Sequence, residues 1–83
     1  MLINHTLEPI EIDGIVYDQR HGGPFDRGAA DSYYGRGRRP HFFTDATYAS
    51  DEIPEAFMTR SQVAEYHAGY DYNEQSGDKK DWN

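Results

Sequence analysis

The residues best suited to chemistry in this chain are arginines, and they are concentrated in one short segment. Residues 20–41 hold five arginines against two aspartates, a local charge of +3 in a chain whose formal net charge is −7. No lysine occurs before Lys79. The planar guanidinium of arginine binds phosphate or carboxylate through paired hydrogen bonds and stacks on aromatic rings, which lysine does poorly. Because lysine would serve solubility equally well, the use of arginine alone indicates binding.

Aromatic, hydroxyl and imidazole side chains in the same segment could complete a binding site. Nearby glycines would let backbone amides approach an anion, and aromatic rings would stack on a planar base. We therefore predict a pocket for a small phosphate-containing, nucleotide-like ligand, in which arginines bind phosphate, rings stack on the base, and a serine and a histidine orient the ligand. The predicted ligand-binding residues are Arg27, Ser32, Tyr33, Tyr34, Arg36, Arg38, Arg39, His41 and Phe42.

Two other interpretations of the arginine segment stay open. The arginines could pair with the chain's own carboxylates, within one molecule or across an oligomer interface, and so only hold the fold together. They could also contact another macromolecule. The net charge of −7 would repel a polyanion beyond one local patch, which argues against direct nucleic-acid binding.

The second half of the chain is acidic and favours an alternative function. Residues 41–83 carry nine acidic side chains against three basic ones. An acidic face on a C-terminal helix, containing Glu65, Asp71 and Glu74, could imitate a phosphate backbone and occupy a nucleic-acid-binding protein. The alternative function is therefore an acidic protein-binding inhibitor.

Patterns of catalysis and metal binding are missing from the sequence. The absence of cysteine excludes disulfides and thiolate metal sites. The four histidines, at positions 5, 21, 41 and 67, do not match metal-ligand spacing. Neither a phosphate loop nor a nucleophile-elbow motif occurs. We therefore expect a non-enzymatic protein without a cofactor or a bound metal.

Strands are predicted on both sides of the arginine segment. An Asp-Gly pair at 13–14 lies between two β-branched runs, which is typical of a tight hairpin turn, so we expect strands at about 5–12 and 15–19. A third strand is expected at about 41–49, followed by a polar loop at 50–54. The third strand is predicted to extend the hairpin.

A short helix is predicted inside the arginine segment, at 26–34. Asp26 is placed to cap its beginning, and Gly35 or Gly37 would end it. Gly28 would weaken it.

The clearest helix is predicted at about 60–74. Thr59 and Gln62 have the spacing of a capping box, and Gly77 would end the helix. Gly69 is expected to be a weak point in it. A polar tail follows at 77–83, and its Trp82 is expected to dock back on the domain. Together these elements predict a small α+β single domain, residues 1–83, with the longer C-terminal helix across the sheet.

The apolar composition is thin for a domain of 83 residues. Leucine, isoleucine, valine and phenylalanine contribute 13 residues, and seven tyrosines and one tryptophan must supply much of the core. Small cores of this kind often need help from oligomerisation, so we expect a homo-oligomer. No apolar run reaches the ~20 residues of a membrane span, and the N-terminus lacks a signal-peptide pattern, so we expect a cytoplasmic protein with no membrane partner.

Two stretches, GGPFDRGAADSYYGR…PHF and GYDYNEQSGDKKDW, give the chain a resemblance to short uncharacterised accessory proteins of tailed bacteriophages and prophages. The resemblance rests on Pro24, Asp26, Arg27, Gly28, Ala30, Asp31, Ser32, Tyr33, Tyr34, Arg36, Pro40 and His41, and on Tyr66, Gly69, Tyr70, Asn73, Gly77, Asp78, Lys80, Asp81 and Trp82. It implies an anti-defence role, exerted either by binding a host defence protein or by sequestering a nucleotide signal. It carries no established activity for these residues.

Overall fold

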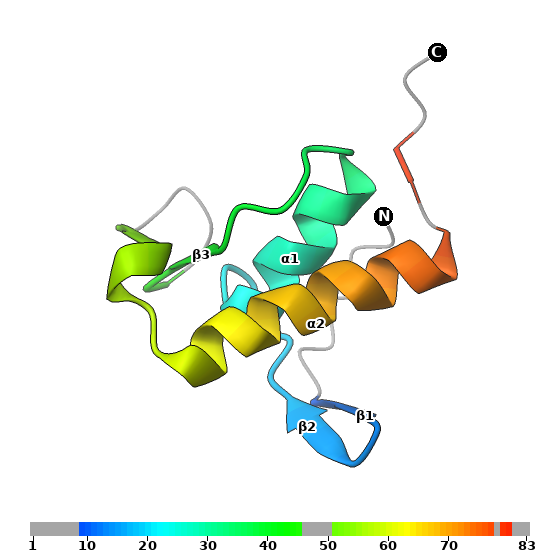
Figure 1. The fold of residues 1–83 in the computed structure, drawn as a ribbon, viewed down its shortest axis with the longest axis horizontal. Coiled ribbons are helices and arrows are strands. Elements are labelled where there is room, and N and C mark those ends of the chain that lie inside the picture. Colours follow the sequence, from blue (N-terminus) through cyan, green and yellow to red (C-terminus); the bar gives the residue numbers. More distant parts are fainter. Residues whose placement is uncertain (1–8, 46–50, 78, 81–83) are drawn as a thin grey trace.

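The computed structural model describes residues 9–45, 51–77 and 79–80, and confirms the predicted α+β class (Figure 1). Two antiparallel strand pairs and two crossing helices make up the described chain. In chain order the elements are β1 (Ile10–Ile12), β2 (Ile15–Tyr17), α1 (Pro24–Tyr33), β3 (His41–Phe43), β4 (Glu52–Pro54), the 3-10 helix η1 (Glu55–Phe57) and α2 (Arg60–Ser76).

The N-terminal hairpin of β1 and β2 turns where the sequence predicts. Asp13 and Gly14 both have positive φ, at 53° and 81°, which is the backbone of a two-residue type I′ turn. Ile12 then pairs with Ile15 next to the turn. The observed strands are shorter than predicted, since β2 ends at Tyr17, and the predicted residues 5–8 lie outside the described chain.

Helix α1 begins two residues earlier than predicted, and its cap is different. Gly23 is the N-cap and Pro24 the first helical residue, where the fixed φ of proline suits the helix and its missing N–H costs nothing. Asp26 instead accepts a hydrogen bond from the Gly22 N–H, at 2.9 Å, and so fixes the turn before the helix. The predicted stop is confirmed, because Gly35 follows the last turn with a φ of 69°.

The third strand does not extend the hairpin. β3 forms a separate antiparallel pair with β4, with Phe42 opposite Ile53 and Phe43 opposite Glu52. β4 occupies the stretch that the sequence predicts to be a polar loop. β3 also ends at Phe43 rather than near 49, and residues 46–49 of that prediction lie outside the described chain.

Helix α2 begins and ends as its sequence signals predict. The Thr59 hydroxyl accepts from the Gln62 N–H at 3.1 Å, and the Gln62 side chain accepts from the Thr59 N–H at 2.8 Å, which completes a capping box. The helix ends at Ser76, and Gly77 follows with a φ of 71°. Trp82, which was expected to dock on the domain, lies outside the described residues.

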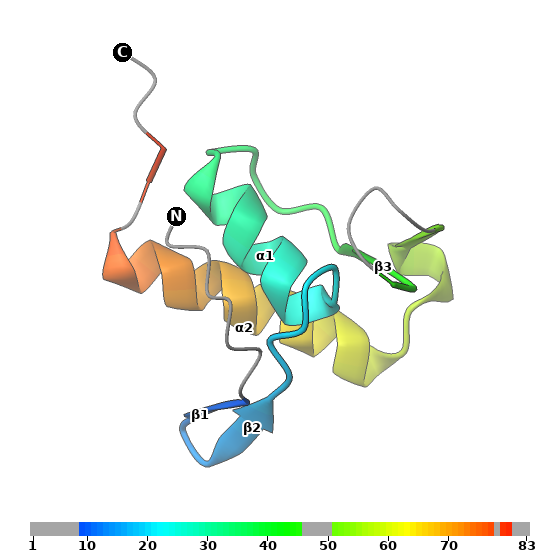
Figure 2. The same ribbon diagram turned by 180° about the vertical axis from the view of Figure 1, so that it is seen from behind.

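The core lies where α1 crosses α2, and not between a helix and a sheet (Figures 1 and 2). A Cβ atom on Gly28 would lie 2.0 Å from the Tyr66 carbonyl oxygen, and one on Gly69 would lie 2.0 Å from that of Phe25. Only glycine fits at either place. The two glycines therefore allow the helix backbones to touch, and their predicted role as weak points is replaced by this packing role.

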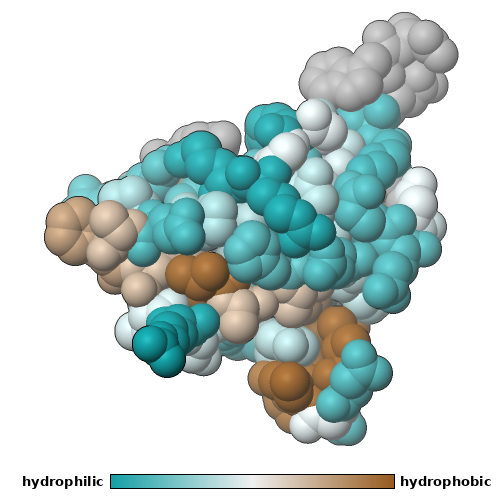
Figure 3. All heavy atoms as spheres, viewed as in Figure 1, coloured by the Kyte–Doolittle hydropathy of each residue, from teal (hydrophilic) through white to brown (hydrophobic). Residues whose placement is uncertain are grey.

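Few apolar side chains are buried around this crossing. Among the described residues the buried hydrophobic side chains are Phe25, Ala30, Phe43 and Tyr66, and five polar or charged residues are buried with them. Apolar surface remains exposed at the hairpin, where Figure 3 shows it at the bottom of the view, at Ile15 and Val16. No helix in the described chain is long and apolar enough to cross a membrane.

Candidate arginine pocket

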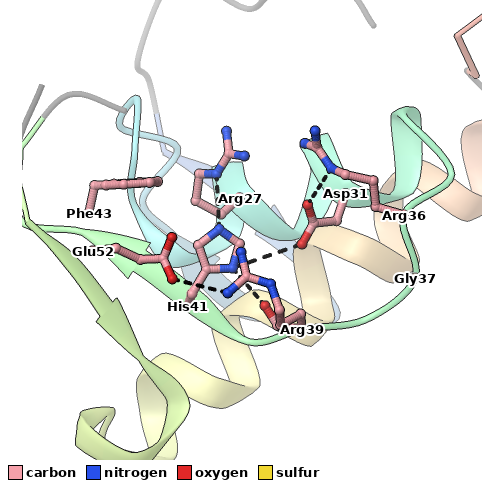
Figure 4. A pocket seen from close by; sticks show the side chains of 8 residues that line it. All are labelled: Arg27, Asp31, Arg36, Gly37, Arg39, His41, Phe43 and Glu52. Carbon is pink, nitrogen blue, oxygen red and sulfur yellow. Dashed lines mark hydrogen bonds and ion pairs between the residues drawn. The ribbon is translucent and has the colours of Figure 1, made fainter. Parts of the chain in front are cut away.

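A pocket of about 370 Å³ lies beside α1 and contains three of the predicted arginines (Figure 4). It is lined by Arg27, Asp31, Arg36, Gly37, Arg39, His41, Phe43 and Glu52. Arg27 and Asp31 belong to α1, and Arg36, Gly37 and Arg39 to the segment after it. His41 and Phe43 belong to β3, and Glu52 belongs to β4. The turn after α1 and the β3–β4 pair therefore bring together side chains that are distant in sequence.

His41 is buried at the base of this pocket and has a defined protonation pattern. Its Nδ1 lies 2.6 Å from the Arg39 carbonyl oxygen, which can only accept, so Nδ1 carries the proton. Its Nε2 lies 3.4 Å from Arg27 Nε, whose N–H can only donate, so Nε2 accepts. His41 thus contacts the Arg27 guanidinium through Nε, and the guanidinium carbon lies 5.7 Å from the Phe43 ring centroid.

Asp31 is the buried carboxylate of the pocket and is held by several donors. Arg36 Nε donates to it at 3.0 Å, the Tyr66 hydroxyl donates to its other oxygen, and His41 Nδ1 lies 3.9 Å away. The Tyr66 hydroxyl in turn accepts from the Arg39 N–H at 2.9 Å. Burial and the adjacent Asp31 carboxylate raise the pKa of the Tyr66 hydroxyl far above its usual value. Asp31 therefore fixes α1, α2 and the segment between α1 and β3 to one another.

Arg39 and Glu52 form an ion pair at the more exposed side of the pocket. Arg39 Nη1 donates to Glu52 Oε2 at 3.0 Å. This hydrogen bond lowers the pKa of Glu52 and raises that of Arg39. Each group stabilises the charge of the other, but both side chains remain partly in water.

Arg36 completes the cationic lining next to Asp31. Its guanidinium carbon lies 4.6 Å from the centroid of the Tyr34 ring, so the predicted aromatic neighbour stacks on an arginine. In Figure 4 the guanidinium groups of Arg27 and Arg36 point to the same side of the pocket.

Ser32, Tyr33 and Tyr34 do not line this pocket. Ser32 is fully buried against α2, where its hydroxyl donates to Glu74 at 2.6 Å and accepts from Asn73 at 2.9 Å. Tyr33 and Tyr34 contact each other edge to face, with centroids 4.9 Å apart. Ser32 therefore joins the two helices instead of facing a ligand.

Arg38 and Phe42 also lie outside the pocket. Arg38 lies over the Tyr70 ring, with its guanidinium carbon 4.3 Å from the centroid, and it also contacts His67 and Asp71 of α2. Phe42 points to the opposite face of β3 from His41, because side chains alternate along a strand. Five of the nine predicted ligand residues are thus absent from the lining.

The predicted list of ligand-binding residues omits four residues of the lining, Asp31, Gly37, Phe43 and Glu52. Strand alternation would have found Phe43, because residues 41 and 43 share one face of the predicted strand. Glu52 depends on the pairing of β3 with β4, for which the local sequence gave no signal.

The charged side chains of the pocket are mostly cationic, and nothing in the described chain indicates a metal. Three guanidinium groups and two carboxylates line it, which gives these five side chains a net charge of +1. No group of three or more histidine, aspartate or glutamate side chains within the described ranges is arranged to hold a metal ion. Comparison with known proteins adds no further guide, because no family model, curated protein or solved structure matches this chain.

Proposed function

We propose that this chain is a non-catalytic binding protein that sequesters a small phosphate-containing ligand, such as a nucleotide signal, in the arginine pocket. The observation that carries the proposal is that Arg27, Arg36 and Arg39 all line one hollow in a chain of net charge −7. A guanidinium group can donate paired hydrogen bonds to the oxygens of a phosphate. An excess of one positive charge suits a compact anion and not a polymer.

The volume of the pocket limits the size of the ligand. Small-molecule sites range over about 300–1,000 Å³, so a hollow of about 370 Å³ is at the lower end of that range. We therefore expect one chain to hold a ligand no larger than a mononucleotide. A cyclic dinucleotide would require a pocket shared between two copies of the chain.

The resemblance to phage accessory proteins gives this binding a biological setting. A phage protein that removes a nucleotide signal in the host cytoplasm would blunt the defence that the signal activates. Binding without turnover would be sufficient for that role, and it requires no catalytic group.

The alternative, an acidic inhibitor that acts through α2, has less support. Arg38 contacts Asp71 and Lys79 contacts Glu74, so both carboxylates are partly neutralised within the chain. Burial raises the pKa of Glu65, the third member of that face. The face therefore offers a protein partner less negative charge than the sequence suggests.

Calorimetric titration and ligand release test the proposal. Heating the purified protein should release nucleotides that mass spectrometry identifies, and AMP, 3′,5′-cyclic AMP and inorganic phosphate should be titrated in turn. We expect Arg39→Gln to weaken binding of the best of these about tenfold or more, because a hydrogen bond to a charged group is lost.

Arg60→Gln is the matched control, since Arg60 is exposed at the start of α2 and does not line the pocket. It removes the same charge and should leave the affinity almost unchanged. If no released nucleotide and no heat of binding were found with any probe, the proposed function would be wrong. Equal losses in the two variants would also contradict it, since they would reflect net charge alone.

A further inference from the structure

The two carboxylates of the arginine pocket differ in how firmly they are held. The Asp31 side chain is 5% exposed and accepts from Arg36 and Tyr66, whereas the Glu52 side chain is 39% exposed. Removing Asp31 from its partners would leave a buried charge without compensation, which is costly. Glu52 can move into water without that cost, so it is the displaceable carboxylate of the pair.

Strand pairing explains why Glu52 reaches the pocket. Glu52 lies directly opposite Phe43 in the β3–β4 register, and residues opposite each other in an antiparallel pair share one face. His41 is two residues from Phe43 and lies on that same face. The pair of strands therefore places a carboxylate next to the Arg39 side chain that precedes β3.

The Glu52–Arg39 contact is weak enough to be exchanged. It consists of the hydrogen bond from Nη1 to Oε2, and the Arg39 side chain is 64% exposed. Ion pairs as exposed as this one contribute at most about 1 kcal/mol. A phosphate group presents more oxygens than one carboxylate and can contact more than one guanidinium at once.

We propose that Glu52 occupies the anion position on Arg39 in the ligand-free protein and must be displaced when a phosphate-bearing ligand enters. This inference rests on the proposed function, because it names the group with which the ligand competes. Glu52 acts as an internal competitor that lowers the affinity of the pocket for anions. Anions that contact Arg39 alone do not displace Glu52. Ligands that also contact Arg36 or Arg27 do displace it.

Titration of AMP into the wild-type protein, Glu52→Gln and Glu55→Gln tests the competition. Glu52→Gln should bind AMP about threefold to fivefold more tightly than the wild-type protein, because the competing ion pair is removed. Glu55→Gln is the matched control, since Glu55 is exposed in η1, does not line the pocket and carries the same charge. Its affinity for AMP should stay within about twofold of wild type.

The carboxyl titration of Glu52, followed by ¹³C NMR, gives an independent readout. In the free protein the pKa of this carboxyl is below its ordinary value because Arg39 donates to it. At saturating AMP the pKa should rise, because the hydrogen bond is lost and a negative charge has come near.

The outcomes separate the two proposals. If AMP binds but Glu52→Gln behaves like Glu55→Gln, or if the pKa of Glu52 does not rise, the displacement of Glu52 is wrong and the binding function stands. If AMP, 3′,5′-cyclic AMP and inorganic phosphate all fail to bind the wild-type protein and Glu52→Gln, and heating releases no nucleotide, both proposals are wrong. Circular dichroism of each variant establishes that a change in affinity does not come from unfolding.

Discussion

Adjacent arginines of one segment have different structural roles. Arg39 lies in the pocket and pairs with Glu52, while its neighbour Arg38 faces α2 and pairs with Asp71. Residue type therefore predicted which side chains could bind an anion, but not which of them share a site. The missing information is the direction of each side chain, because an irregular backbone has no fixed period. Arg36, Arg38 and Arg39 do pair with carboxylates of the chain itself, which is one part of the interpretation in which they only hold the fold together, and ligand binding remains a prediction.

The Tyr66 hydroxyl takes part in two hydrogen bonds of the buried network around Asp31. Tyr66→Phe removes the donor to Asp31 and the acceptor for the Arg39 N–H. We expect a loss of about 1–3 kcal/mol in the free energy of unfolding, measured by urea denaturation, because Asp31 is left with fewer partners in a buried site. Tyr72→Phe is the control on the same helix, since Tyr72 is 42% exposed and contacts Phe25 through its ring. Equal stabilities of the two variants would contradict the role of the network.

Because of the same hydroxyl, the free energy of unfolding should depend on pH in the alkaline range. Because the pKa of Tyr66 is raised in the folded state, its contribution is intact below the ordinary tyrosine pKa of about 10 and is lost as pH rises above it. The stability difference between the wild-type protein and Tyr66→Phe should therefore begin to shrink above about pH 10 and shrink further as pH rises. A constant difference would mean that the hydroxyl does not titrate differently on unfolding.

At the scale of elements, the features that the sequence predicts correctly are those that a few adjacent residues determine. The Asp13-Gly14 turn, the Thr59–Gln62 capping box and the stop at Gly77 are all local, and all three were found. β4 was missed because its three residues form a strand only through pairing with β3, a contact that no local pattern contains. The packing of α1 on α2 was missed for a similar reason. In the sequence, a glycine that permits a close helix crossing cannot be distinguished from a glycine that only weakens a helix.

Gly69→Ala tests whether the helices cross as closely as the backbone positions require. Alanine favours a helix over glycine by about 1 kcal/mol, yet here its methyl group would meet the Phe25 carbonyl oxygen at 2.0 Å. We expect a destabilisation of about 3 kcal/mol in urea denaturation, because a backbone atom cannot rotate away. At the exposed Ala64 of the same helix the preference should reverse, and Ala64→Gly should cost roughly 1 kcal/mol. A stabilised Gly69→Ala would contradict the close crossing.

At the scale of the whole molecule, the charge and the apolar surface are both unevenly placed. Three arginines of the segment form ion pairs within the domain. The partners are Asp31 of α1, Asp71 of α2 and Glu52 of β4. Among the described residues the sheet of β1 and β2 has two strands, and Ile15 and Val16 are both exposed on it, at 55% and 63%. A two-stranded hairpin is marginally stable alone, and exposed strand edges are templates for pairing with another chain.

The exposed hairpin is therefore the surface through which we expect two copies of the chain to associate. Val16→Lys should shift sedimentation velocity profiles toward the monomer, because a charged side chain on an exposed strand opposes pairing. Phe57→Ser is the control, since Phe57 is 78% exposed but lies in η1, away from the hairpin in Figures 1 and 2. Its profile should match that of the wild-type protein. A wild-type chain that sediments as a monomer at every concentration would contradict the expected homo-oligomer.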